Sequence, residues 1–237
     1  MEEECMTEKR TMTLVEMTSQ RIISYIIEHK MMPGDQLPTE VEFLEKMEVS
    51  RGTLREAFKV LVARNILEIR QGAGTFISYK KGIPDDPLGL TFIYDDNRLV
   101  LDMLEVRLMF EPRVAELAAV NATPEQKQAL EAQAQELENC ISRGEPYAEA
   151  DSRFHRLIAE ASDNRVIGNL THILNSSVSK NIEITLDTQR ENNTIYYHRK
   201  ILKAIQEGNI NNAHYFMTMH LNLLREFVLN KMEKEGK

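Results

Sequence analysis

The sequence predicts a mainly α-helical protein with two parts: a small N-terminal unit of three helices plus a β-hairpin wing, joined to an all-α antiparallel helical bundle. Two observations support this prediction. Up to residue 78, three segments with apolar residues at helical spacing are followed by two short alternating segments around a glycine turn. After residue 90, helical stripes continue with no convincing strand. Residues 80–89 between the two parts hold two prolines, two glycines and two aspartates, which is typical of a linker.

Composition excludes several classes of protein. The chain has 237 residues, 42% of them apolar and 28% charged, which suits two modest globular domains rather than a disordered or fibrous protein. Charges interrupt every apolar stretch before the roughly 20 residues of a membrane span. The acidic start, MEEECMTEKR, lacks the apolar run of a secretion signal, so we expect a cytoplasmic protein with no membrane partner. Cys5 and Cys140 are expected to be reduced, although spacing alone leaves one bridge between them open.

Three helices are expected in the N-terminal domain. The first covers about residues 13–30. Thr39 has Glu42 three residues further on, the spacing of a capping box, so a second helix is expected to begin there. Ser50 starts the third helix in the same way, with one apolar face and one cationic face.

A hairpin completes this domain. Residues 66–70 and 75–78 read as two short strands around the turn Gln71–Gly74. Three helices followed by a hairpin make a winged helix-turn-helix. We therefore expect a DNA-binding domain over residues 1–79, a linker over 80–89 and a helical domain over 90–237, to which the family resemblance described below assigns effector binding and dimerisation.

Charge is sorted along the chain. The whole chain has a net charge of −8, yet Val49–Lys81 holds seven basic and two acidic side chains, a net charge of +5. A recognition helix reads base edges and phosphates from its first turn, where this chain has Ser50, Arg51, Thr53 and Arg55. The glycine turn at Gln71-Gly72 lets the backbone approach a groove closely. The alternative is that these arginines form an ordinary solvated helix face.

A family resemblance covers about residues 13–78. It is carried by Leu37-Pro38-Thr39-Glu40, Glu42-Phe43-Leu44, Val49-Ser50-Arg51-Gly52-Thr53-Leu54-Arg55-Glu56-Ala57 and Gly72-Ala73-Gly74-Thr75-Phe76-Ile77. Together these motifs resemble the N-terminal signature of GntR-type transcriptional regulators. The resemblance implies that DNA-contacting positions are occupied by Ser50, Arg51, Gly52, Arg55, Gln71 and Gly72. Family members commonly carry an arginine where this chain has Val41, so a contact from the second helix is expected to be missing.

The second domain reads as helices throughout. The expected helices cover 99–120, 124–141, 147–162, 166 to about 186, 192–206 and 210–232. Asp151 and His155 stand four residues apart and therefore project from one face of one helix. His198 and His220 lie on later helices. Three imidazoles and one carboxylate suit a divalent metal, with Zn as first choice and Ni, Mn or Fe as alternatives. A single histidine of this kind is more often an ordinary hydrogen-bonded core or surface residue than a metal ligand, so the prediction depends on the four residues together.

Residues 82–232 resemble a second family. The motifs are Glu105-Val106-Arg107, Phe110-Glu111-Pro112, Ala115-Glu116-Leu117-Ala118-Ala119, Asp151 to His155, Asn164, and His198 to His220. They are similar to the FadR-type C-terminal ligand-binding domain, the FCD domain. The resemblance implies that Asp151, His155, His198 and His220 hold a divalent metal, and that Arg107 lies near the effector cavity. Arg107 has a second interpretation, as a structural ion pair with Glu105, Glu111 or Asp102.

These features predict a homodimeric transcriptional regulator rather than an enzyme. Two winged domains would bind double-stranded operator DNA as an inverted repeat, and a small organic acid bound at the metal would weaken operator binding. A metal-dependent hydrolase or lyase is the rival hypothesis, since Asp and His ligands can also activate water. No nucleophile constellation accompanies the cluster, and Glu160 is the one carboxylate left open as a general base. A third hypothesis is a pure metal sensor.

Overall fold

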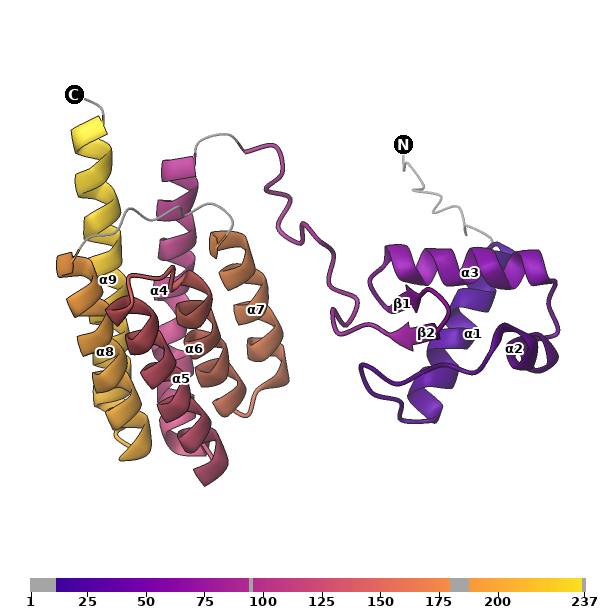
Figure 1. The fold of residues 1–237 in the computed structure, drawn as a ribbon, viewed down its shortest axis with the longest axis horizontal. Helices are drawn as coiled ribbons and strands as arrows, with labels where there is room; N and C mark the ends of the chain where they lie inside the picture. Colours follow the sequence, from indigo (N-terminus) through magenta and orange to yellow (C-terminus); the bar gives the residue numbers. More distant parts are fainter. Residues whose placement is uncertain (1–11, 94–95, 180–187, 236–237) are drawn as a thin grey trace, which may run out of the picture. The chain divides into compact units, whose positions relative to one another are not determined.

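The computed structural model describes residues 12–93, 96–179 and 188–235. It divides into two compact units, residues 1–87 and 88–237. Each unit is described by itself below. The described elements confirm the predicted fold class, since they comprise helices and one two-stranded antiparallel sheet (Figure 1).

The N-terminal unit consists of three helices and a hairpin. Its elements are α1 (Leu14–Glu28), α2 (Glu40–Met47), α3 (Arg51–Ala63), β1 (Leu67–Arg70) and β2 (Gly74–Ile77). The strands pair antiparallel, with Leu67 opposite Ile77 and Arg70 opposite Gly74. Apolar side chains from all three helices and both strands form one core, whose largest fully buried side chains are Ile22, Phe43, Leu54, Leu61 and Leu67.

Local capping explains where these helices begin. Thr39 and Glu42 form the predicted capping box: the Thr39 backbone N–H donates to Glu42 Oε2 at 2.7 Å, and the Glu42 backbone N–H donates back to Thr39 Oγ1 at 3.4 Å. Ser50 caps α3 by accepting from the Thr53 backbone N–H at 3.1 Å. Because α2 ends at Met47, the two caps make a helix-turn-helix in which α3 starts at Arg51.

The segment expected to be a linker is partly attached to the N-terminal unit. Asn65 Nδ2 donates to the Ile83 carbonyl at 2.8 Å, and the Gly82 N–H donates to the Asn65 carbonyl at 2.9 Å. Lys80 and Asp85 form an ion pair at 2.6 Å. The division between the two units, between Pro87 and Leu88, falls inside residues 80–89, the segment expected to be the linker.

The C-terminal unit is a bundle of helices around one apolar core (Figure 1). Its helices are α4 (Asp96–Asn121), α5 (Pro124–Ser142), α6 (Ala148–Ala161), α7 (Arg165–Ser179), α8 (Thr188–Gln206) and α9 (Ile210–Glu235). Helix α4 packs against α6, α7, α8 and α9, so it is the central element of the bundle. The expected extension of the fourth of these helices to about residue 186 lies outside the described residues. No helix in the described part of the chain is both long enough and apolar enough to cross a membrane.

Candidate functional site

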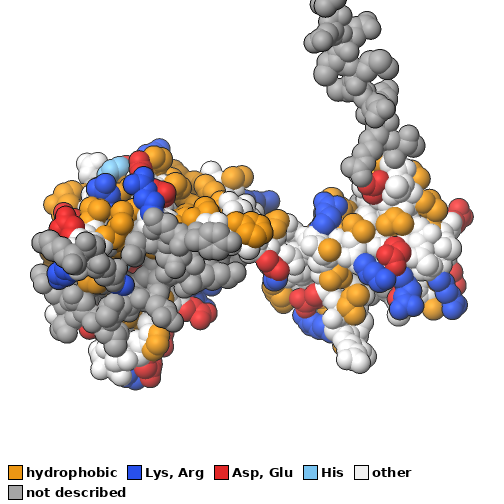
Figure 2. Space-filling model, turned by 90° about the horizontal axis from the view of Figure 1, so that it is seen from above, with side chains coloured by type: hydrophobic (Ala, Val, Ile, Leu, Met, Phe, Trp, Pro, Cys, Tyr) orange, Lys and Arg blue, Asp and Glu red, His pale blue; other side chains and the backbone are white. Residues whose placement is uncertain are grey.

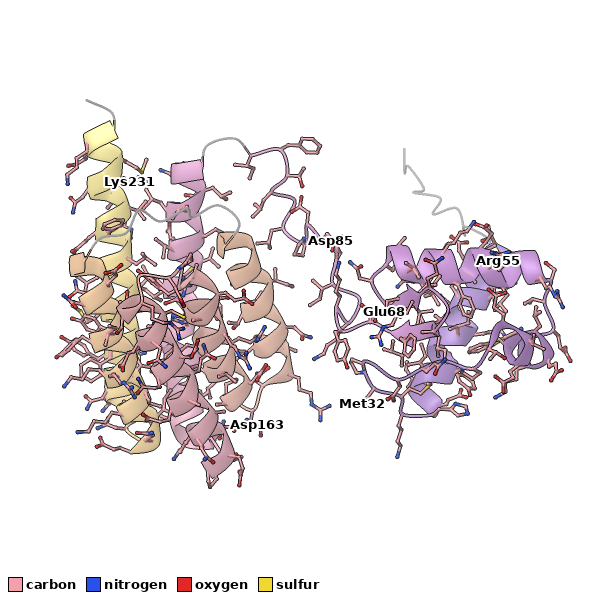
Figure 3. The ribbon with its side chains drawn as sticks, viewed as in Figure 1. Met32, Arg55, Glu68, Asp85, Asp163 and Lys231 are labelled. Carbon is pink, nitrogen blue, oxygen red and sulfur yellow. The ribbon has the colours of Figure 1, made fainter. Side chains whose placement is uncertain are left out.

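The first turn of α3 is the candidate nucleic-acid interface. Ser50, Arg51, Gly52 and Arg55 are exposed, and Thr53 is half-buried. Arg55 lies on α3 (Figure 3), and its Nε stands 3.9 Å from Glu40 Oε1, a loose contact between two exposed side chains. Arg51 has no ion-pair partner within residues 12–93. The face of the N-terminal unit that carries α3 shows several Lys and Arg side chains in blue (Figure 2).

The residues at the start of α3 have different structural roles. The Ser50 and Thr53 hydroxyls lie 2.9 Å apart and are engaged in capping α3. A Cβ added at Gly52 would meet nothing nearer than the Ser50 hydroxyl at 3.8 Å. No contact with the described residues therefore requires glycine at position 52.

The hairpin tip is held by a residue that sequence reasoning missed. Gln71 and Gly72 lie exposed at the tip, as predicted, and Gly72 has a φ of +73°, a conformation that favours glycine. Gln36 Nε2 donates to the Ala73 carbonyl at 2.8 Å and so ties the turn to the body of the domain. A Cβ on Gly74 would come within 2.6 Å of the same Gln36 nitrogen. No spacing rule links Gln36 to a turn 37 residues further along the chain.

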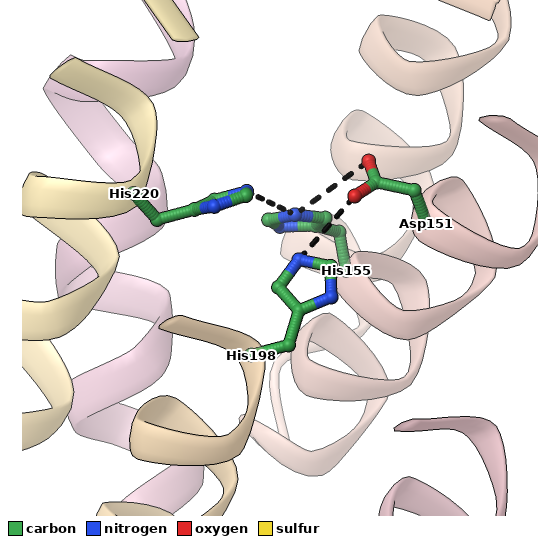
Figure 4. Close-up of side chains that lie close together, drawn as sticks. All are labelled: Asp151, His155, His198 and His220. Atoms are coloured by element: carbon green, nitrogen blue, oxygen red, sulfur yellow. Dashed lines mark hydrogen bonds and ion pairs between the residues drawn. The ribbon is translucent and has the colours of Figure 1, made fainter. Parts of the chain in front are cut away.

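The candidate metal centre lies in the helical unit. Asp151 and His155 come from α6, His198 from α8 and His220 from α9 (Figure 4). One ligand atom from each residue can be chosen so that all four lie within 4.8 Å of one another. The structure thus brings together all four residues of the predicted ligand set.

The side-chain nitrogen and oxygen atoms of these four residues lie close enough to one another to surround a common point. His155 Nε2 lies 3.3 Å from His220 Nε2 and 3.9 Å from Asp151 Oδ2, and His198 Nε2 lies 3.3 Å from Asp151 Oδ1. The Phe154 ring stacks on the His198 ring with centroids 4.5 Å apart, which fixes the plane of that imidazole. Nitrogen and carboxylate oxygen atoms in this arrangement form a donor set for a borderline divalent ion.

Burial of the three histidines makes the site energetically unfavourable when no ligand pairs with their ring nitrogens. His155, His198 and His220 are 2%, 1% and 6% exposed, and both ring nitrogens of His198 lack a hydrogen-bond partner among the described residues. A buried polar atom without a partner costs about 1–3 kcal/mol. Burial lowers the pKa of His198 to about 4, against the opposing effect of Asp151, so this ring is neutral at physiological pH with a lone pair available. These observations fit a divalent metal held by the four residues.

A buried ion pair lies directly behind the cluster. Arg107 Nε donates to Glu111 Oε1 at 2.5 Å, and Glu111 Oε2 lies 2.7 Å from His155 Nδ1. Both Arg107 and Glu111 are 3% exposed. The His155 contact is short but bent, since Nδ1 makes no hydrogen bond of regular geometry. Burial alone would raise the pKa of Glu111, but Arg107 and His155 hold it at about 2, so the carboxylate is ionised.

Three carboxylates are expected as possible ion-pair partners of Arg107, and the structure shows which of them forms the pair. Of the three candidates, Glu111 forms the pair, while Asp102 contacts Arg98 at 3.1 Å. Burial by itself lowers the pKa of Arg107, but the Glu111 and Asp151 carboxylates raise it, so its charge is within electrostatic reach of the cluster. Sequence reasoning missed the contact of Glu111 with His155. The sequence shows that Arg107 and Glu111 have the i,i+4 spacing of a helical pair. This spacing gives no information about a contact of Glu111 with His155, which lies on α6 and 44 positions later in the chain.

Other polar residues lie away from the cluster. Glu160, left open as a general base, is 54% exposed in its side chain and stands 4.0 Å from Arg156. His214 contacts Glu116 at 2.7 Å on the exposed side of α9. Asn164 caps α7 as its sequence position predicts, accepting from the backbone N–H groups of Val166 and Ile167 at 3.1 and 3.2 Å. Cys140 is a free thiol in the described chain, and Cys5 lies outside the described residues.

Comparison with known proteins gives two family matches. The model for bacterial regulatory proteins of the gntR family matches residues 14–77, and the model for the FCD domain matches residues 102–223. The galactonate operon transcriptional repressor of Escherichia coli is 30% identical and aligns over 78% of this chain and 84% of its own length. The HTH-type transcriptional regulator LutR of Bacillus subtilis is 28% identical, over 86% of this chain and 96% of its own length.

A solved structure agrees with these matches. The structure described as Streptococcus agalactiae GntR superimposes with a TM-score of 0.79 at 39% sequence identity. It covers 90% of this chain and 99% of that one. The similarity therefore extends over both units.

Proposed function

The chain belongs to the GntR family of bacterial regulatory proteins and carries an FCD domain, and from this premise we propose that it is a dimeric regulator whose operator affinity is set by a small carboxylate bound at a divalent metal. Its relatives and matched domains are DNA-binding regulators of transcription, not enzymes. The observation that carries the finer proposal is the cluster of Asp151 with the buried His155, His198 and His220, in which His198 has no hydrogen-bond partner within the part of the chain that the structure describes.

The metal would be held by these four residues. Zn is the first choice, and Ni, Mn or Fe accept the same donors. A bound divalent ion supplies a Lewis-acidic position at which a carboxylate can exchange with water. The chain's own contribution is to keep His198 neutral, to orient His155 and to surround the donors with apolar side chains of the bundle.

Arg107 supports an acidic effector. A guanidinium has donors beyond those that Glu111 uses, and a buried cation close to the cluster favours a ligand with negative charge. The relative from Escherichia coli is named for galactonate, which is itself a carboxylate. Because a divalent ion such as Zn²⁺ also binds carboxylate oxygen, these observations favour small organic acids as the effector class.

The DNA contacts are assigned to one turn and one hairpin. Ser50, Arg51, Gly52, Thr53 and Arg55 would approach the major groove, and Gln71 with Gly72 the neighbouring groove or backbone. A homodimer would place two N-terminal winged domains on the two halves of an inverted repeat. Effector binding then needs a coupling free energy of only about 1–3 kcal/mol to change operator affinity roughly 5–150-fold.

Operator titration in the presence of acids tests this function. An operator is first selected from a random duplex pool with the purified protein, and its Kd is then measured with Zn²⁺ present across a panel of small hydroxy- and oxo-acids. We expect at least one acid to weaken binding in the wild type and in His214→Ala, whose histidine lies outside the cluster, but not in His198→Ala. An operator Kd unchanged by every acid would contradict the proposal.

A further inference from the structure

We propose that Glu111 is a positioning residue that holds His155 so that its Nε2, and not its Nδ1, is presented to the metal. This inference rests on the proposed metal site and extends it by one residue outside the ligand set. It is drawn from the two oxygens of Glu111: Oε1 contacts Arg107 and Oε2 contacts His155 Nδ1.

The chemistry of the two groups sets the tautomer. An ionised carboxylate accepts hydrogen bonds but cannot donate them, so His155 meets it favourably only with the proton on Nδ1. The lone pair then lies on Nε2, which is the atom 3.3 Å from His220 Nε2 and 3.9 Å from Asp151 Oδ2. With the opposite tautomer, two lone pairs would face each other at Glu111, and a proton would occupy the position that a metal needs.

Arg107 keeps Glu111 in place. The guanidinium stands one helical turn before the carboxylate on α4 and contacts both of its oxygens, at 2.5 and 3.4 Å. Without that cation, Glu111 would be a buried anion with no cationic partner on α4, and its ionised form would be costly. The series Arg107, Glu111 and His155 therefore links the centre of α4 to a ligand on α6. Carboxylates that accept from the outer nitrogen of a ligating histidine typically contribute 10–100-fold to metal affinity.

Helix α4 offers a closely matched control. Glu116 also contacts one arginine, Arg113, and one histidine Nδ1, that of His214 at 2.7 Å, but it does so away from the cluster. Glu111→Gln and Glu116→Gln therefore make the same chemical change to the same kind of pair on the same helix. Only the first should affect the metal site.

Two readouts test the inference. Nitrogen-15 NMR of histidine side chains in metal-free protein reports the tautomer of His155, and competition with a chelator gives the Zn²⁺ dissociation constant. We expect the wild type and Glu116→Gln to show His155 protonated on Nδ1, and Glu111→Gln to lose that single tautomer. Zn²⁺ should bind about 10–100-fold more weakly to Glu111→Gln, whereas Glu116→Gln should keep the affinity of the wild type.

The outcomes separate this inference from the proposed function. Glu111→Gln that keeps both the tautomer and the Zn²⁺ affinity of the wild type would overturn the role of Glu111 alone. Absence of binding of Zn²⁺, Ni²⁺, Mn²⁺ and Fe²⁺ alike in the wild type would overturn the proposed function, and the tautomer would still decide whether Glu111 orients His155. Because Glu111→Gln leaves Arg107 as an unpaired buried charge, Arg107→Met/Glu111→Gln, which removes both charges, provides a folded alternative with the same expected loss.

Discussion

His155 Nε2 and His220 Nε2 face each other 3.3 Å apart inside the helical unit, although their residues are 65 positions apart in the chain. These two ring nitrogens can share at most one proton along this line, and neither nitrogen of the adjacent His198 has a hydrogen-bond partner in residues 12–93, 96–179 and 188–235. Lone pairs that converge on one buried point are a poor arrangement for an apolar core and a good one for a cation. This relationship is the structural basis of the metal centre proposed above.

The arginines of α3 should carry much of the operator affinity. Arg51→Ala and Arg55→Ala each remove an exposed guanidinium from the first two turns of α3. We expect each to cost about 1–3 kcal/mol of binding free energy if it contacts a base, or to lower the salt slope by about 1 if it contacts a phosphate. Fluorescence anisotropy on the selected operator at several salt concentrations measures both quantities. Arg143→Ala, at an exposed position of the helical unit, is the control, and folded α3 variants that bind like it would contradict the assignment.

Position 41 should allow a gain of affinity. Val41 lies on α2 with 58% of its surface exposed, and the sequence resemblance expects an arginine there. Val41→Arg should add one phosphate contact, which makes operator binding tighter and its salt dependence steeper by about 1. The same anisotropy titration checks this. Val166→Arg adds the same charge at an exposed valine of α7, and an equal effect from both variants would show that the gain is non-specific.

Acid stability should depend on an ion pair between α5 and α8. Arg199 donates to both oxygens of Glu138, at 2.5 and 2.8 Å, and to Glu131 at 2.5 Å. The hydrogen bond from Arg199 lowers the pKa of Glu138 below its ordinary value of 4.5. The folded state therefore binds this proton less readily than the unfolded state, so the stabilisation is complete above about pH 4.5 and is lost as the pH falls below it.

Thermal unfolding of Glu138→Gln at a series of pH values tests whether this stabilisation is lost at low pH. We expect the variant to be less stable than the wild type by about 1 kcal/mol at neutral pH, with the difference in Tm shrinking below about pH 4.5. Glu136→Gln is the matched control, because Glu136 lies on the same helix and stands 3.5 Å from Arg143 with both side chains exposed. A difference in Tm between wild type and Glu138→Gln that stays constant down to pH 3 would rule out the ion pair as its cause.

Local signals in the sequence account for the fold. The capping box of Thr39 and Glu42 depends on residues three apart, and the glycine hairpin on a few neighbours, so both could be predicted and both are confirmed. The spacing of Asp151 and His155 likewise placed them on one helix face. Bringing His198 and His220 to that face depends on how α8 and α9 pack on α6, which no local pattern encodes. Their place in the ligand set came from resemblance.

Two supporting residues were beyond prediction for the same reason. Glu111 was noted as one of three possible partners for Arg107, but its contact with His155 joins α4 to α6. Gln36 stands in a loop, and its bond to the Ala73 carbonyl appears only when the hairpin has folded back on that loop. Contacts of supporting residues such as Glu111 and Gln36 depend on tertiary packing and could not be predicted from local sequence. The arginines near the start of α3 could be, because they belong to one helix.

Metal content tests the central claim most directly. Purified wild type, His155→Ala, His198→Ala and the surface control His214→Ala should be analysed by elemental analysis and native mass spectrometry after addition of divalent ions. We expect about one metal per chain in the wild type and in His214→Ala, and none in the two cluster variants. Wild-type protein that holds no metal under these conditions would contradict the account, and the buried histidines would then be a structural network only.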